Sequence, residues 1–518
     1  MNLPIKIGVA GIIGNDILPQ TSLYYKNAGL KWGKNSLNYL IVELIKNELW
    51  DKIYVLHPNI GETEEQVKLN VKNPVDTDEA QRKEFTNSPF IIANEVRYDK
   101  TKTQYANTNI IPSTSLLLNN LSVTYKFNLE VEEANGTAYG VVDSSVSNGI
   151  LLYNPKTTAG GAFAVRLNDS GAFSELSGGT SKGISTHVRS TSLIVASYKD
   201  GVLVKLGSRA STNLSTKPIF EGCYSNNGTP ANYYSNNYGF QAWGESLTSD
   251  EVGILKTIVD EFYVKLKTET VYDVYIQLGD SQAQGEIAIA DFGSPYLNAQ
   301  TGAIYDTNVN KIVPIGVSTT IGYGGDTITF KRAIEQELSR QYYIDKGRKC
   351  IIFKVAKGST YLAAKPTGTY SFSPDGLEDA YDINYRFKTA WPLFTAYLDT
   401  LGVSYNIKSV LCFLGDNDSR NETDANNFQA NFNAFIDNTR LFLNDLTVPF
   451  VFPEIYSDAG GNEPYWEIVR GALQYTVANK SNCYSFDAAN YGRVDTIHYD
   501  KQALIDMAVI IYNITKNI

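Results

Sequence analysis

The chain has 518 residues, of which 43% are hydrophobic and 19% charged, and its formal net charge is -10. This length exceeds that of one ordinary core and predicts a globular protein of several domains. Because the chain is acidic and has no long basic run, its composition excludes the electrostatic surface of a nucleic-acid-binding protein. There is also no apolar run of roughly 18 residues or more, so we expect no membrane span.

Residues 1–110 form the part with the weakest pattern, and we assign them to a mixed N-terminal region. The opening segment, MNLPIKIGVAGIIGND, is apolar but is interrupted by Lys6, and it lacks a basic start and a small-residue cleavage site. We therefore do not predict a signal peptide there. From Asn38 to Lys46 the apolar residues recur with a helical period, which predicts one helix.

Residues 111–268 carry short runs of alternating apolar and polar residues, such as SVTYKFNLEVE and STSLIVASY, separated by Gly, Asn and Ser clusters. This alternation predicts an antiparallel β-sandwich. Asp200 and Gly201 stand between two such runs and predict a hairpin, because its turn needs positive φ. Thr248 or Ser249 is expected to cap a final helix. This closing segment resembles the end of a concanavalin-like jelly roll, which implies a glycan-binding module.

Residues 269–518 alternate strand-like and helical patterns. The runs VYDVYIQLG, KCIIFKVAKG, SVLCFLG and VPFVFPEIY are typical of buried strands, and TFKRAIEQELSRQYY and NNFQANFNAFIDNTRLFLNDL are typical of helices. Such alternation predicts an α/β domain with a mostly parallel sheet and helices on both faces. In these sheets the reactive groups collect at the carboxyl ends of the strands.

Ser281 follows the first of these strands, in the segment GDSQAQG. A serine between a strand end and a helix start is exposed to substrate, and its own N–H points to where an oxyanion would form. Ser281 is therefore the candidate nucleophile. Taken alone, the three residues GDS are also typical of an ordinary helix-capping turn.

Asp495 and His498, in the segment DTIH near the C-terminal end, supply the other two groups that a serine nucleophile needs. A histidine can take the serine proton, and a carboxylate three residues earlier can fold back to hold the other ring nitrogen. The sequence has three histidines, and His57 and His187 fall in the regions assigned to other domains. His498 is therefore the candidate base.

Gly358 and Asn417 lie at the ends of the next two strands, in KVAKGST and GDND. The N–H of Gly358 and the Asn417 amide could join the N–H of Ser281 in an oxyanion hole, where each donor contributes about 3 kcal/mol. Taken separately, both segments are also typical of strand-end turns.

Together the four blocks resemble the SGNH (GDSL-type) hydrolases, through Ser281, Gly358, Asn417 and His498. The resemblance implies a flavodoxin-like three-layer α/β/α domain and a serine esterase that needs no cofactor. A narrower resemblance is to the sialate O-acetylesterase-like carbohydrate esterases. It covers the chain from Val271 onward. The matching residues are Gly279, Ser281, Gly285, Gly415, Asp418, Trp466, Arg470 and Gln474.

This second resemblance has departures: Asp280 and Gln282 replace Gln and Asn of the family pattern, and Asp416-Asn417 replaces Glu-Ser. These departures leave undetermined which acyl group is removed and which sugar carries it. No substrate-binding residue is assigned. The family implies removal of small acyl groups, most often acetyl, from polysaccharide hydroxyls.

We predict no metal site. The four cysteines are scattered singly, without a CxxC pair, and Cys350 and Cys412 lie in apolar runs, as expected of small buried side chains. The segment GDNDSRNETD is acidic like a calcium loop, but Arg420 takes its fifth position and Asn421 the sixth, where glycine is needed.

Three biological roles remain open. An esterase beside a lectin-like module, without a signal peptide, fits a bacteriophage tail fibre or tailspike that deacylates a bacterial surface polysaccharide, by analogy of architecture. Its N-terminal region would then dock to other virion tail proteins, and a homo-oligomer is one arrangement left open. The alternatives are an extracellular or periplasmic carbohydrate esterase with a binding module, and a catalytically silent, glycan-binding structural adhesin.

Overall fold

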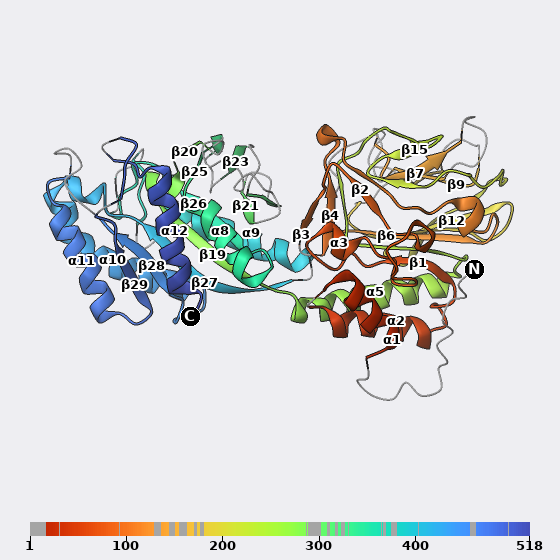
Figure 1. Cartoon of the computed structure of the whole chain (residues 1–518), viewed down its shortest axis with the longest axis horizontal. Coiled ribbons are helices and arrows are strands. Elements are labelled where there is room, and N and C mark those ends of the chain that lie inside the picture. The colour runs from red at the N-terminus through yellow and green to blue at the C-terminus, as the bar shows by residue number, and fades with distance from the viewer. Residues whose placement is uncertain are drawn as a thin grey trace. The chain divides into compact units, whose positions relative to one another are not determined.

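The structure is a computed structural model, and contacts divide the chain into two compact units (Figure 1). The first unit comprises Met1–Thr270 with Asp399–Val403, and the second comprises Val271–Leu398 with Ser404–Ile518. The N-terminal segment considered above as a signal peptide lies outside the described residues. The structure describes residues 17–518 except 31, 93, 129–135, 144–150, 155–162, 170–173, 177–180, 286, 289–301, 308–310, 316–319, 323–326, 330, 364, 366–368, 374–380, 402, 456–462, 490 and 496.

Two mostly antiparallel sheets make up the body of the first unit. One has the strand order β1-β18-β6-β11-β12-β13, and the other has the order β10-β9-β8-β7-β14-β5-β2. One hydrophobic cluster takes residues from both sheets, and within it the rings of Tyr125 and Tyr139 stack 4.1 Å apart. The two sheets therefore share a core. The strands of the first sheet are β1 (Ile53–His57), β6 (Leu121–Phe127), β11 (Gly183–Arg189), β12 (Ile194–Lys199), β13 (Val202–Ser208) and β18 (Phe240–Gly244).

Strands from the first 110 residues belong to both of these sheets. Strand β1 pairs with β18, and β5 pairs with β14, although the partners lie far apart in the sequence. Strands β5 and β2 therefore complete one sheet and β1 the other, whereas β3 and β4 form a separate three-stranded sheet with β17. The remaining strands of the unit are β2 (Glu84–Thr86), β3 (Phe90–Ile92), β4 (Glu95–Tyr98), β5 (Tyr105–Asn107), β7 (Tyr139–Val142), β8 (Leu151–Asn154), β9 (Phe163–Leu167), β10 (Ser174–Leu176), β14 (Phe220–Glu221), β15 (Tyr224–Asn226), β16 (Thr229–Ala231) and β17 (Asn236–Tyr238).

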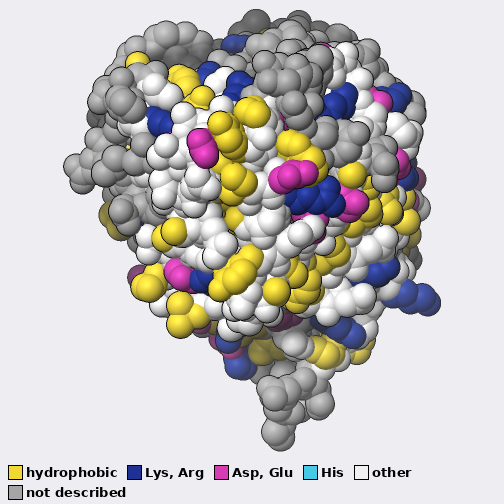
Figure 2. Space-filling view, turned by 90° about the vertical axis from the view of Figure 1, so that its left-hand side faces the viewer, with side chains coloured by type: hydrophobic (Ala, Val, Ile, Leu, Met, Phe, Trp, Pro, Cys, Tyr) yellow, Lys and Arg dark blue, Asp and Glu magenta, His cyan; other side chains and the backbone are white. Residues whose placement is uncertain are grey.

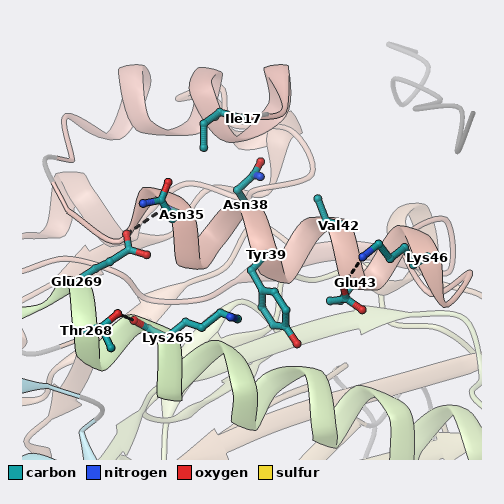
Figure 3. Close-up of a pocket in the computed structure, with 10 residues that line it drawn as sticks. All are labelled: Ile17, Asn35, Asn38, Tyr39, Val42, Glu43, Lys46, Lys265, Thr268 and Glu269. Atoms are coloured by element: carbon teal, nitrogen blue, oxygen red, sulfur yellow. Dashed lines mark hydrogen bonds and ion pairs between the residues drawn. The ribbon is translucent and has the colours of Figure 1, made fainter. Parts of the chain in front are cut away.

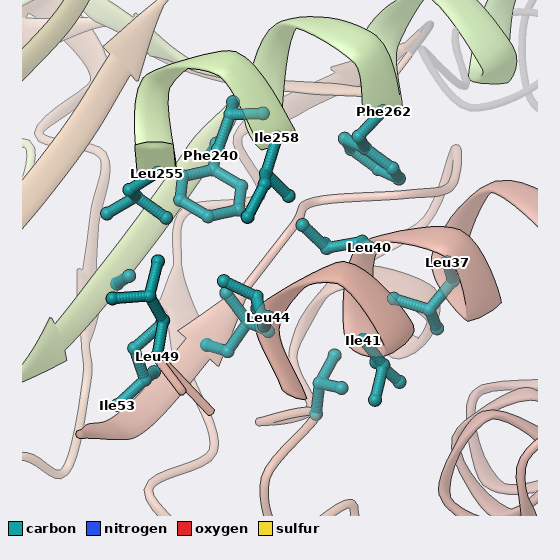
Figure 4. Packing of buried hydrophobic residues seen from close by; sticks show 14 of the residues in the cluster. Leu37, Leu40, Ile41, Leu44, Leu49, Ile53, Phe240, Leu255, Ile258 and Phe262 are labelled. Carbon is teal, nitrogen blue, oxygen red and sulfur yellow. The ribbon is translucent and has the colours of Figure 1, made fainter. Parts of the chain in front are cut away.

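Helices α2 and α5 pack against each other and cover the sheet that contains β18 (Figure 4). In this cluster Leu40 and Leu44 of α2 lie close to Leu255 and Ile258 of α5. Helix α2 confirms the helical period predicted after Asn38. The helices of the unit are α1 (Pro19–Ala28), α2 (Lys34–Lys46), α3 (Glu64–Val67), α4 (Pro112–Ser115) and α5 (Ser249–Glu269).

Two local predictions for the first unit are confirmed. Asp200 and Gly201 both have positive φ and connect the antiparallel strands β12 and β13. Thr248 caps α5 in a capping box, in which its side chain accepts a hydrogen bond from the N–H of Glu251 and the Glu251 carboxylate binds the N–H of Thr248.

A largely parallel sheet forms the centre of the second unit, with the order β22-β21-β26-β19-β27-β28-β29. Strands β21, β26, β19, β27, β28 and β29 run parallel, and β22 adds one antiparallel strand at the edge, beside β21. The predicted α/β character of this part is confirmed. Its strands are β19 (Val271–Gly279), β20 (Ile287–Ala288), β21 (Ala303–Asp306), β22 (Lys311–Pro314), β23 (Thr320–Gly322), β24 (Thr327–Thr329), β25 (Lys331–Arg332), β26 (Ile351–Ala356), β27 (Ser404–Phe413), β28 (Phe450–Glu454) and β29 (Cys483–Asp487).

Helices cover both faces of this sheet, because consecutive side chains of a strand point in opposite directions. On one face Ile352 of β26 belongs to a cluster with residues of α8 and α12. On the other face the ring of Phe353 lies 5.1 Å from Trp391 of α9, and Phe452 lies 5.0 Å from Phe432 of α10. The helices are α6 (Ser281–Gln284), α8 (Glu335–Lys346), α9 (Ile383–Thr400), α10 (Glu422–Phe442), α11 (Trp466–Asn479) and α12 (Lys501–Thr515).

One helix of the second unit begins later than its pattern predicts. The sequence TFKRAIEQELSRQYY favours a helix from Thr329, but α8 begins at Glu335. Lys331 and Arg332 instead form strand β25, which pairs with β20. A tertiary pairing therefore overrides the local helical period.

The surface of the second unit is mixed in character. Figure 2, which shows the side of the molecule that carries α10 and α11, has acidic and basic side chains interspersed among hydrophobic and uncharged ones. Cys350 and Cys412 are buried, which confirms their prediction as core residues. No helix among the described residues is long and apolar enough to cross a membrane.

Candidate active site

Ser281 lies at the carboxyl edge of the central parallel sheet. It is the first residue of α6, directly after β19, and its side chain is half-buried. The loop before it is held by the N–H of Asp280, which donates to the carbonyl of Phe413 over 2.9 Å. A Cβ on Gly279 would approach that same carbonyl oxygen to 2.3 Å, so this close passage of two strands requires glycine.

Gly358 lies beside Ser281. A Cβ built on this glycine would come within 3.5 Å of the Cβ of Ser281, so a side chain at 358 would crowd the nucleophile. The N–H of Gly358 donates to Oε1 of Gln284 over 2.7 Å. An oxyanion can use this N–H only after the Gln284 side chain has moved away.

Asp495 and His498 are joined by a hydrogen bond of 2.7 Å between Oδ2 and Nδ1. The other carboxylate oxygen accepts the N–H groups of Ile497 and His498, each at 2.7 Å. Desolvation raises the pKa of Asp495, but these hydrogen bonds outweigh it and lower the pKa to about 2. Asp495 therefore stays ionised and fixes the imidazole with Nε2 free to act as a base.

Gln282, the residue after Ser281, connects the nucleophile segment to the turn that carries His498. Its Nε2 donates to the carbonyl of Ile497 over 2.8 Å, and its Oε1 accepts the N–H of Tyr499 over 3.4 Å. Both neighbours of His498 are thus bonded to the neighbour of Ser281. Within the described residues no hydrogen bond joins Ser281 and His498 directly, as is common for catalytic pairs without substrate.

Asn417 connects the third block to the loop after β26. Its buried side chain donates from Nδ2 to the carbonyl of Thr360 over 3.1 Å, which leaves one of its two amide protons for another acceptor. The neighbouring Asp418 accepts the N–H groups of Leu362 and Ala363. The blocks singled out in the sequence therefore meet at one edge of the sheet.

Two buried carboxyl groups, Asp280 and Asp416, were not predicted as part of this site. Burial, together with the charge of Asp416, raises the pKa of Asp280 well above its usual range. Burial also raises the pKa of Asp416, against the charge of Arg493 and a hydrogen bond from Gln282. One signal in the sequence could have pointed to them, since Asp280, Gln282 and Asp416 are among the departures from the family pattern.

The other two histidines lie in the first unit. His57 in β1 and His187 in β11 are both buried, and burial lowers the pKa of each. Tyr234 and Tyr238 are buried as well and belong to the core cluster of that unit. Among the described residues no group of His, Cys, Asp and Glu side chains could hold a metal ion.

A hollow of about 580 Å³ in the first unit lies between α2 and the end of α5 (Figure 3). Its lining is polar, but its side chains already pair with one another: Lys46 with Glu43, and Glu269 with the N–H of Asn35. Neither serine nor histidine lines this hollow, so it lacks the candidate nucleophile and base.

Residues 383–513 match the family model described as carbohydrate esterase, sialic acid-specific acetylesterase. The matched segment includes Asn417, Asp495 and His498, whereas Ser281 and Gly358 lie before it. The narrower resemblance stated from the sequence is confirmed for this part of the chain, and the match supports a carboxylic ester hydrolase that acts on carbohydrate.

Among solved structures, a protein from Arabidopsis thaliana is 17% identical, with 48% of this chain and 98% of that chain covered and a TM-score of 0.36. A carbohydrate acetylesterase from Xanthomonas citri is 11% identical, with 71% and 70% covered and a TM-score of 0.33. NanS is 14% identical, with 48% and 97% covered and a TM-score of 0.35. At TM-scores below 0.5, none of these similarities says what this chain does. No curated protein matches the chain.

Proposed function

We propose that the second unit is an SGNH-type serine esterase that removes O-acetyl or other small acyl groups from a polysaccharide. The observation that carries this proposal is that Gln282 binds both neighbours of His498, while Gly358 lies against Ser281. Five of the six parallel strands, β26, β19, β27, β28 and β29, follow the 2-1-3-4-5 order of flavodoxin-like sheets, whose sites lie at this edge, and β21 adds a sixth beside β26.

In the proposed reaction the Ser281 hydroxyl attacks the acyl carbonyl carbon, and its proton passes to Nε2 of His498. Asp495 stabilises the resulting imidazolium through Nδ1–H. Once the Gln284 side chain has moved off the N–H of Gly358, the tetrahedral oxyanion accepts the N–H groups of Ser281 and Gly358 and the amide of Asn417. His498 then returns the proton to the sugar oxygen, which leaves. Water hydrolyses the acyl-enzyme, and acetate or another short acid is released.

The experiment is acid release from p-nitrophenyl acetate and from O-acetylated bacterial polysaccharide. We expect Ser281→Ala and His498→Ala each to lower kcat by about a thousandfold or more, since both residues act on the reacting atoms. Ser249→Ala, an exposed serine in the first unit, is the matched control and should keep full activity. Intact protein without activity on any acylated substrate would contradict the esterase and favour the glycan-binding adhesin.

We further propose that the first unit is a concanavalin-like jelly roll that binds glycan, and that the chain belongs to a bacteriophage tail. Two facing antiparallel sheets with a shared core support the first part. The second part rests on analogy of architecture alone. Detection of the chain by mass spectrometry in purified phage particles of its host is the test, and its presence only in bacterial culture fluid would favour a secreted esterase.

A further inference from the structure

Gln282 makes more connections than a residue that merely fills a turn. Its side chain is 5% exposed, and its amide bonds to three groups of two other segments: the carbonyl of Ile497, the N–H of Tyr499 and the carboxylate of Asp416. Both amide protons and one oxygen lone pair are therefore used. A buried amide with these bonds is costly to reorient, because each lost partner leaves an unsatisfied polar group.

The connections fix the position of the imidazole relative to the serine. Ile497 and Tyr499 flank His498, so a shift of that turn away from α6 breaks two hydrogen bonds to Gln282. Asp495 fixes the ring from the other side, through Nδ1. Since a displacement of about 1 Å at a reacting group can cost 100-fold in rate, a bond that spans both groups has a direct effect on catalysis.

Gln282 also lies between two buried carboxyl groups. Its backbone N–H donates to Asp280 over 3.0 Å, and its side-chain Nε2 donates to Asp416 over 3.3 Å. The neutral side-chain amide donates to Asp416 without adding charge. The other titratable or charged side chains that act on Asp280 and Asp416 are Asp418, Glu463, Arg420, Arg493 and His498.

We propose that Gln282 is a positioning residue, which holds the turn of His498 against the segment of Ser281. This inference rests on the proposed esterase function. Among the described residues the side chain of Gln282 bonds neither the Ser281 hydroxyl nor the His498 ring, and it acts through the placement of the base. Its loss is expected to slow the chemical step and to leave substrate binding largely unchanged.

The first test compares Gln282→Ala with the intact protein. We expect kcat to fall about 100-fold while KM changes less than about threefold, because the base is misplaced and the binding surface is kept. Gln336→Ala is the matched control: Gln336 is also a buried glutamine of the second unit, and its amide bonds only the carbonyl of Ile315 among the described residues. This control should lose stability without the loss in kcat.

The variant Gln282→Glu provides a second measurement, the pH dependence of kcat, which would not change if Gln282 had only a structural role. A protonated carboxyl can still donate to Ile497, whereas an ionised one has no proton and faces the carboxylate of Asp416. The kcat of this variant relative to the intact protein should therefore fall as pH rises, while the relative kcat of Gln282→Ala should not depend on pH. A folded Gln282→Ala that keeps kcat within about threefold overturns the proposal, and so does a pH-independent ratio for Gln282→Glu.

A measurement without substrate separates this inference from the esterase function. The chain has three histidines, so ¹⁵N-histidine spectra are simple, and the signals of His498 are those lost in His498→Ala. We expect the His498 signals to shift and broaden in Gln282→Ala, because the turn that carries the ring loses two hydrogen bonds, while the signals of His57 and His187 stay unchanged. If the His498 signals respond but no ester is cleaved by the intact protein, the positioning role stands and the esterase fails. If ester is cleaved and the His498 signals are unchanged, the positioning role fails.

Discussion

Each of the two units contains a fully buried Lys–Glu ion pair, and the two pairs have different surroundings. In the second unit Nζ of Lys354 lies 2.9 Å from Glu335, whose other oxygen accepts hydrogen bonds from Gln277 and the N–H of Ala333. In the first unit Nζ of Lys83 lies 3.3 Å from Glu221. The second oxygen of Glu221 has no partner among the described residues.

The difference lies in what the lysine reaches besides its carboxylate. Lys354 also donates to the carbonyl of Gln284, the last residue of α6, so the pair supports the helix that begins at Ser281. Lys83 donates instead to Asn59, inside the sandwich. A buried ion pair is weak evidence for stability, because desolvation offsets most of its attraction. The pair of the second unit is therefore better explained by placement of the nucleophile than by stability.

The largest expected effects come from breaking each pair. Lys354→Met and Lys83→Met each leave a buried carboxylate without its cation, which costs about 3–5 kcal/mol of the free energy of unfolding. We expect only Lys354→Met to lower kcat as well, since only Lys354 bonds α6. Urea unfolding, hydrogen exchange of β26 and β14, and acetate release measure the two effects separately.

A second substitution in each lysine variant separates the loss of stability from the loss of kcat. Glu335→Gln added to Lys354→Met, and Glu221→Gln added to Lys83→Met, remove the isolated charge and should recover most of the lost stability. The kcat of the first double variant should stay low, because no donor to Gln284 is restored. A recovered kcat, or an equal loss of kcat in Lys83→Met, would contradict a positioning role for the buried pair.

The fold was predictable where local patterns decide it. The strands of the second unit are continuous apolar runs, and the turn at Asp200-Gly201 and the cap at Thr248 depend on neighbouring residues only. The insertion of β1 and β5 into the two sheets depends on partners such as Gly244 for Ile53 and Phe220 for Asn107. Because these strands are short and their partners distant, no period in residues 17–110 reveals them.

The reacting groups of the candidate site could be predicted from the sequence, but the residues that hold these groups in place could not. Ser281 and His498 lie in short motifs whose chemistry can be inferred from residue types. The support comes from Gln282, Gln284 and Lys354, whose contacts span 215, 74 and 70 positions of the sequence, respectively. An amide or ammonium group acquires such a role only when tertiary structure brings its partner to it.

A smaller effect is expected at Asp418, a buried carboxylate which, unlike Glu335 and Glu221, forms no ion pair among the described residues. Burial raises its pKa to about 7, against the N–H groups of Leu362 and Ala363 that it accepts. A raised pKa means that the native state binds more protons than the unfolded state between about pH 4 and 7. The stability contributed by this group is therefore present below about pH 4 and lost as pH rises through 7.

Asp418→Asn cannot titrate, and its side-chain oxygen can still accept the two N–H groups. We expect the free energy of unfolding of this variant to decline less steeply than that of the intact protein between about pH 4 and 7. Urea unfolding at several pH values measures the slope. Part of the slope should remain, because burial also raises the pKa of Asp280 and Asp416. An unchanged slope would show that Asp418 titrates in its ordinary range.

The smallest expected effects come from one helix cap in each unit. Thr248 caps α5, and Asp500 caps α12 by accepting the N–H of Ala503 over 2.8 Å. Replacing either by alanine costs about 1 kcal/mol of the free energy of unfolding. Asp500, however, is two residues from His498, and its own N–H donates to the carbonyl of Gly492. We therefore expect Asp500→Ala to lower kcat severalfold and Thr248→Ala to leave it unchanged, as acetate release at matched stability would show. Equal activities of the two variants would mean that the turn of His498 is held by Gln282 and Asp495 without help from α12.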